Sequence, residues 1–243
     1  MKIFSVIVLL LISFVSRAAD NPGGISLEAT RVIFASDKNS TGLTVNNSSS
    51  KDIWLIRAWM TQYKKENEKK TPFVITPPLY RLEPNEKLQL RINSTDVSSL
   101  PTDRESVFKV NVLAIPPKTQ LNNGKGKAAD ELSGGYLQFA INNSIKLFYR
   151  PSVLNDPARI EKSRNQLQVI KKGNDIEVVN PAPYYFTLIN VKVNGSPLRD
   201  ESSRDLMVSP FGSLHISAPG AVNMEFQTIN DFGASTPVMK KTF

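Results

Sequence analysis

The feature that most constrains the fold is a series of short runs in which apolar and polar residues alternate. In the longest, residues 136–151, Leu137, Phe139 and Ile141 alternate with polar or small residues, and the pattern resumes after residue 144. A period of two residues is typical of a β-strand with one apolar face. The run ends at residues 150–151, where a proline cannot continue a central ladder.

Similar runs recur along the chain and are separated by turn residues. About seven lie before residue 152, and a second, smaller set lies between residues 166 and 229. Short alternating strands at this spacing are typical of an immunoglobulin-like sandwich. We therefore predict an all-β chain of two immunoglobulin-like β-sandwich domains, residues 19–151 and 152–243, joined through residues 150–156.

The first 18 residues have the pattern of a secretory signal peptide. Lys2 precedes an apolar run at residues 3–15, and the small residues Ser16 and Ala18 follow. Such a run is short for a membrane span, and no second one follows. We predict export with cleavage after Ala18, with Ala19 as the alternative. Removing Lys2 and Arg17 lowers the formal charge from +8 to +6.

The composition excludes several function classes. The chain has no cysteine, so neither a disulfide framework nor a thiol nucleophile is available, and its single histidine, His215, lies in an ordinary alternating run. No cluster of metal ligands and no glycine-rich phosphate loop is evident. We predict no enzyme activity, no catalytic residue, no cofactor and no metal. Nucleic-acid binding is not expected of an exported chain without a basic patch interleaved with aromatics.

The strand at residues 136–151 has two interpretations. Its apolar face belongs either to the core of the protein or to an exposed sheet edge that pairs with another protein and fills its pockets. Composition alone does not choose between them.

Five short motifs resemble one protein family. They are TRVIF at 30–34, DRESVF at 103–108, AIPP at 114–117, IKLFYRP at 145–151 and NPAPYY at 180–185. In this order they resemble the Gram-negative periplasmic pilus chaperones of the chaperone–usher pathway, over nearly the whole mature chain.

The resemblance implies two immunoglobulin-like domains in an L shape, and a periplasmic chaperone that works without ATP. It would capture, help fold and cap fimbrial or surface-fibre subunits by donor-strand complementation, then deliver them to an outer-membrane usher. The donor strand would fill the subunit groove with Leu137, Phe139 and Ile141. Arg31 and Lys146 match the paired basic residues that bind the C-terminal carboxylate of the subunit.

The resemblance also implies a charged interdomain cluster of Glu105, Arg150 and Asp231, in which the arginine bridges the two acids. The polar, glycine-containing segment at residues 118–135 is similar to that of the long-loop subclass. That subclass usually has a disulfide at the base of this loop, and this chain has no cysteine.

Two other function classes remain as alternatives. The chain could be a structural fibre subunit or adhesin, or a secreted carbohydrate-binding sandwich protein. Against the first, a subunit would more often be one incomplete domain. For the chaperone we also expect self-association of the free protein to cover its donor edge, and no membrane insertion.

Overall fold

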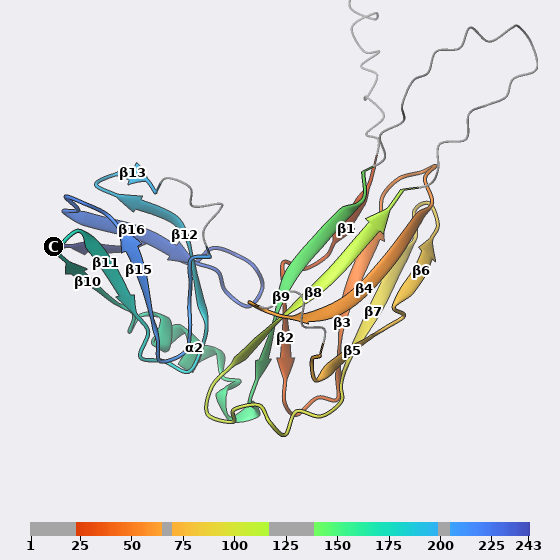
Figure 1. The fold of residues 1–243 in the computed structure, drawn as a ribbon, viewed down its shortest axis with the longest axis horizontal. Coiled ribbons are helices and arrows are strands. Elements are labelled where there is room, and N and C mark those ends of the chain that lie inside the picture. Colours follow the sequence, from red (N-terminus) through yellow and green to blue (C-terminus); the bar gives the residue numbers. More distant parts are fainter. Residues whose placement is uncertain (1–22, 65–69, 117–138, 199–204) are drawn as a thin grey trace, which may run out of the picture.

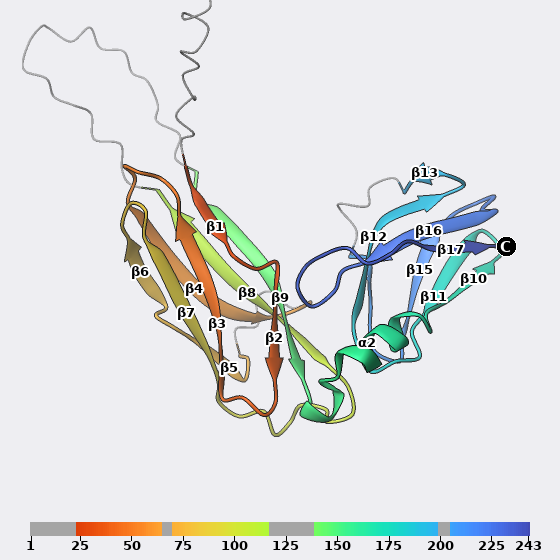
Figure 2. The same ribbon diagram turned by 180° about the vertical axis from the view of Figure 1, so that it is seen from behind.

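The computed structural model describes residues 23–64, 70–116, 139–198 and 205–243. Within these ranges the chain forms two β-sandwich lobes set at an angle, with a short helical connection at the elbow (Figures 1 and 2). The all-β prediction with two immunoglobulin-like sandwiches is confirmed. No helix among the described residues has the length and apolarity needed to cross a bilayer.

The N-terminal lobe packs a four-stranded sheet on a five-stranded sheet. The first sheet has the order β1 (Ile25–Leu27), β3 (Ser40–Asn47), β7 (Lys87–Ser94) and β5 (Phe73–Thr76). The second has the order β2 (Arg31–Ala35), β9 (Ile141–Arg150), β8 (Ser106–Ile115), β4 (Trp54–Gln62) and β6 (Leu79–Leu82).

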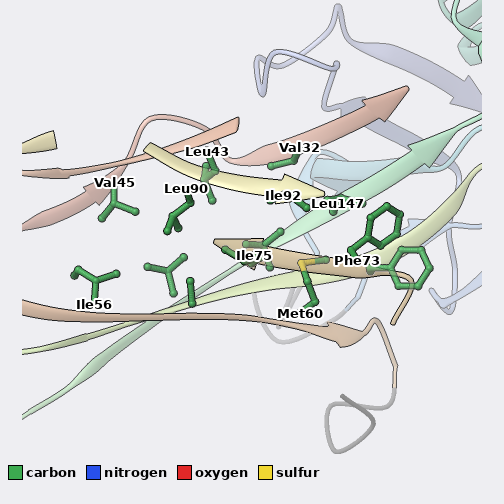
Figure 3. Close-up of a cluster of buried hydrophobic side chains, with 14 of the residues drawn as sticks. Val32, Leu43, Val45, Ile56, Met60, Phe73, Ile75, Leu90, Ile92 and Leu147 are labelled. Atoms are coloured by element: carbon green, nitrogen blue, oxygen red, sulfur yellow. The ribbon is translucent and has the colours of Figure 1, made fainter. Parts of the chain in front are cut away.

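The core of this lobe forms where the apolar faces of the two sheets meet. Figure 3 shows Val45 and Leu90 from the first sheet in the same cluster as Ile56 and Leu147 from the second. All four are buried. Burial of each such side chain contributes about 1.5–3 kcal/mol, so the alternation in the sequence is what holds the sheets together.

Strand β9 has different partners along its two edges. On one edge it pairs antiparallel with β8 along all but its last residue, from Ala114 opposite Ile141 to Ser106 opposite Tyr149. On the other edge it pairs in parallel with β2, which begins only where Arg31 lies opposite Lys146. Among the described residues, the edge of β9 before Lys146 therefore has no neighbouring strand.

The prediction of one strand over residues 136–151 is wrong at its start. Phe139 and Ala140 are described but lie outside the strand, which begins at Ile141. The reason is the end of β8 at Ile115, followed by Pro116, since proline has no N–H to donate to a ladder.

The C-terminal lobe is also built from two packed sheets. One has the order β10 (Gln168–Lys172), β11 (Asp175–Val179) and β15 (Ser213–Ser217). The other has the order β13 (Ser196–Pro197), β12 (Phe186–Val193), β16 (Asn223–Thr228) and β17 (Met239–Thr242), with β14 (Met207–Val208) also paired to β12.

The elbow contains helical structure that the sequence analysis did not predict. A 3₁₀ turn, η1 (Ser152–Leu154), is followed by the helix α2 (Pro157–Arg164). The Asp156 side chain accepts hydrogen bonds from the backbone N–H groups of Ala158 and Arg159, and Pro157 stands at the first helical position. Both are strong helix-start signals, and they explain why this segment is helical rather than an extended linker.

Candidate functional site

The register of three strands places three basic residues in a row. Arg31 on β2 is paired with Lys146 on β9, and Lys146 is paired with Lys109 on β8. Residues paired in register project from the same face of a sheet. This face is turned toward the C-terminal lobe, because the Arg31 Nη1 donates a hydrogen bond to the Ile229 carbonyl of that lobe at 3.2 Å.

The Lys146 ammonium lies in a partly enclosed setting. Its side chain is 24% exposed, its Nζ lies 3.6 Å from the Asp205 Oδ1, and the ring centroid of Tyr63 is 5.3 Å away. Burial lowers the pKa of Lys146, and the nearby charge of Arg31 lowers it further, whereas Asp205 opposes both effects. The Lys146 ammonium is therefore suited to pair with a carboxylate, and Asp205 supplies that carboxylate in this structure.

Arg31 is similarly half-buried. Its guanidinium lies over the Phe148 ring at 5.6 Å from the centroid, and its Nε has no hydrogen-bond partner. Burial lowers the pKa of Arg31, although the charges of Asp231 and Glu105 oppose this shift. A cavity of about 340 Å³ lies beside Arg31 between the lobes, and it also contacts Phe148, Ile160 and Tyr185. A guanidinium at the edge of such a cavity is suited to bind a carboxylate.

Arg150, at the end of β9, joins the two lobes. Its Nε donates to the Glu105 Oε1 at 2.7 Å, and its Nη1 and Nη2 donate to the two oxygens of Asp231 at 2.6 and 2.8 Å. Glu105 also accepts from the backbone N–H of Tyr185 at 2.7 Å. The structure thus places Glu105, Arg150 and Asp231 in one hydrogen-bonded cluster across the elbow.

The cluster is well shielded from solvent. The side chain of Arg150 is 4% exposed. Although burial disfavours its charge, the hydrogen bonds to Asp231 and the charge of Glu105 together raise the pKa of Arg150. The guanidinium therefore stays protonated, and its donors are taken up by neighbouring acids rather than presented to a ligand.

The predicted donor residues lie at the other end of β9. Phe139 is 69% exposed and Ile141 is 53% exposed, whereas Leu147 on the same face of the strand is fully buried in the core. Leu137 lies outside the described residues, as does the predicted long loop at residues 118–135. Two large apolar side chains thus project into solvent beside the open edge of β9.

Sequence reasoning missed Lys109, Tyr63 and Asp205. Lys109 stands between the buried apolar residues Phe108 and Val110 of β8, which is a signal of a cation on the face opposite the core. Tyr63 and Asp205 carry no local signal, because they meet only when the lobes come together: the Tyr63 hydroxyl donates to the Asp205 Oδ1 at 2.6 Å.

Family models match both lobes. Residues 24–155 match the model described as "Pili and flagellar-assembly chaperone, PapD N-terminal domain", and residues 162–239 match "Pili assembly chaperone PapD, C-terminal domain". The chain belongs to the PapD family of pilus-assembly chaperones. It is thus a fimbrial chaperone of the chaperone–usher pathway, and the alternatives of a fibre subunit and a carbohydrate-binding protein are not favoured. Members of this family are periplasmic chaperones, which are not enzymes.

Relatives match this PapD-family chaperone over most of their length. It is 34% identical to "Chaperone protein FocC" of Escherichia coli, over 99% of this chain and 98% of the relative. It is 37% identical to "Probable fimbrial chaperone LpfB" of Escherichia coli O157:H7, over 90% of this chain and 88% of the relative.

Solved structures agree with these matches. The complex of the Salmonella enterica SafA pilin with the SafB chaperone gives a TM-score of 0.74 at 30% identity, covering 90% of this chain and 96% of the matched chain. The periplasmic chaperone SfaE gives a TM-score of 0.70 at 33% identity, covering 88% and 97%.

Proposed function

We propose that this PapD-family chaperone captures, helps fold and caps fimbrial or surface-fibre subunits by donating strand β9, with Arg31 and Lys146 binding the terminal carboxylate of the subunit. The observation that carries the proposal is the parallel register of β2 and β9, which puts both cations at the point where the open edge of β9 ends.

The open edge of β9 offers backbone groups to a partner. Unpaired N–H and C=O groups on an edge strand favour addition of a strand from another chain. Since β2 occupies the edge from Lys146 onward, an added strand would lie in line with β2 and stop next to Arg31.

The charges at that point favour one direction for the added strand. A strand parallel to β9 would bring its C-terminal carboxylate to Arg31 and Lys146. An antiparallel strand would bring an N-terminal ammonium toward two cations, which is repulsive. Electrostatics therefore favour a parallel strand that ends at the basic pair, and the fixed end sets which pocket each side chain meets.

The apolar side chains on the open half of β9 supply further binding energy. Phe139 and Ile141 are more than half exposed, so a subunit groove that covered both would contribute about 3–6 kcal/mol before ordering and association costs. With Leu137 as the third groove-filling residue, the gain suffices for capture that a second strand could later reverse.

The proposal also covers export of the protein, delivery of its subunits and its state when no subunit is bound. Residues 1–18 would be removed as a signal peptide, and the mature chain, with domains at 19–151 and 152–243, would deliver subunits to an outer-membrane usher in the periplasm. Glu105, Arg150 and Asp231 would hold the angle between the domains. When no subunit is bound, self-association would cover the open edge of β9.

Recovery of subunits from the periplasm tests the proposal. The tagged mature chain should retain a small β-rich subunit, and Arg31→Ala or Lys146→Ala should each reduce the retained amount about tenfold or more, because hydrogen bonds between charged groups contribute about 1.5–3 kcal/mol. Arg91→Ala on β7 and Lys241→Ala on β17 are matched controls, since both side chains are exposed outside the site. Undiminished capture by folded Arg31 and Lys146 variants would contradict the anchor.

A further inference from the structure

A small cluster around Lys146 is not used by the proposed function. Tyr63 follows β4 in the N-terminal lobe, and Asp205 precedes β14 in the C-terminal lobe. Together with Lys109 and Lys146 they line a pocket of about 330 Å³. The pocket adjoins the basic pair, because Lys146 belongs to both.

The carboxylate of Asp205 is held in this pocket from two directions. Its Oδ1 accepts a hydrogen bond from the Tyr63 hydroxyl at 2.6 Å and lies 3.6 Å from the Lys146 Nζ. The backbone next to Asp205 is fixed, because Leu206 is buried and its carbonyl accepts from the N–H of Leu188 at 2.8 Å. The contact between lobes therefore has a defined geometry.

Tyr63 also contacts the cations. The Nζ atoms of Lys146 and Lys109 lie 5.3 and 5.6 Å from its ring centroid. An aromatic face attracts an ammonium, and the hydroxyl of the same ring orients Asp205 toward Lys146. The ring and the carboxylate thus bind the Lys146 ammonium much as an external carboxylate would.

We propose that Asp205 is an internal competitor, a carboxylate that occupies Lys146 in the free chaperone and is displaced when the terminal carboxylate of a subunit binds. This inference depends on the proposed function of Lys146. Two carboxylates on one ammonium repel each other, so the incoming group gains less from Lys146 while Asp205 remains in place. Asp205 therefore sets the affinity of the anchor and helps to keep capture reversible.

The test compares two peptides that copy the C-terminal strand of a subunit recovered with the chaperone. One has a free C-terminal carboxylate and the other a C-terminal carboxamide. Calorimetry should show that Asp205→Asn binds the free acid about two- to five-fold more tightly than the wild type, the range expected when a partly exposed ion pair no longer competes. Affinity for the carboxamide should not change.

Two further variants separate competition from a structural effect. Asp205→Glu retains a carboxylate and should bind the free acid nearly as the wild type does. Asp175→Asn changes an exposed aspartate on β11, away from the site, and should also leave the affinity unchanged. A structural effect of Asp205→Asn would instead change the affinities for both peptides together.

The outcomes distinguish this inference from the proposed function. If the wild type binds the free acid and Asp205→Asn binds it equally or more weakly, the competition is wrong while the anchor stands. If neither protein binds the free acid, both the anchor and the competition are wrong. An NMR titration of the Lys146 side chain checks the ion pair without a peptide: Asp205→Asn should lower the pKa of Lys146, and an unchanged value would overturn the pairing.

Discussion

The two halves of β9 carry apolar side chains on the same face, but they differ in how far those side chains are exposed. In the second half, Leu147 and Tyr149 are buried in the core, whereas in the first half Ile141 is exposed on the same face. The difference follows from the neighbours of the strand, since β2 covers one edge only from Lys146 onward. Alternation thus specifies a strand and its apolar face, while the surrounding strands decide whether that face is a core or a binding surface.

Replacing Arg150 at the buried end of β9 should have the largest effect on stability. Arg150→Ala would leave Glu105 buried without its cation and break both bonds to Asp231, at a cost of about 3–5 kcal/mol. Chemical denaturation followed by tryptophan fluorescence measures this for the N-terminal lobe, because both tryptophans, Trp54 and Trp59, are on β4. A loss below about 1 kcal/mol would show that the cluster is dispensable.

The next largest effect is expected from Leu147, in the middle of the buried half. Leu147→Ala should reduce the free energy of unfolding by about 2–5 kcal/mol, because it leaves a cavity in the core. The same denaturation experiment measures the change. Near-wild-type stability would mean that this half of β9 is not part of a tightly packed core.

The smallest effect on stability is expected at Ile141. Ile141→Asp should change the free energy of unfolding by less than about 0.5 kcal/mol, because more than half of the side chain is already exposed, yet it should abolish capture of subunits. Ile145→Asp is the matched control: it lies on the same face but packs against the core, and it should be destabilising. If Ile141→Asp unfolds the lobe, the apolar face of this half of β9 belongs to the core of the chaperone itself and is not a binding surface.

Much of this architecture could be predicted from the sequence, and the exceptions have physical reasons. Local alternation predicts the strands. The short motifs that contain Arg31, Lys146 and Arg150 resemble those of one protein family. The parallel pairing of β2 with β9 could not be predicted, because it joins residues far apart in the chain and no turn specifies its register.

Smaller errors have local causes. The start of β9 depends on where a neighbouring strand ends, so the alternation around Phe139 does not locate it. Helix α2 is only eight residues long and gives too short a pattern to predict, although Asp156 and Pro157 mark its start. Tyr63 and Asp205 belong to different lobes, and only the angle between the lobes brings them together.

The parallel register of β2 with β9 has a further consequence for the proposed function, because the C-terminal end of an added strand would fix the register of the whole strand. A chain end anchored at Arg31 and Lys146 would be the fixed point. The number of residues between that end and any residue of the added strand would then decide which position of β9 the residue lies beside. A subunit could then vary in length upstream without disturbing the match. One extra residue at its C-terminal end would shift the register of the added strand by one residue and turn each groove-facing side chain to the opposite face.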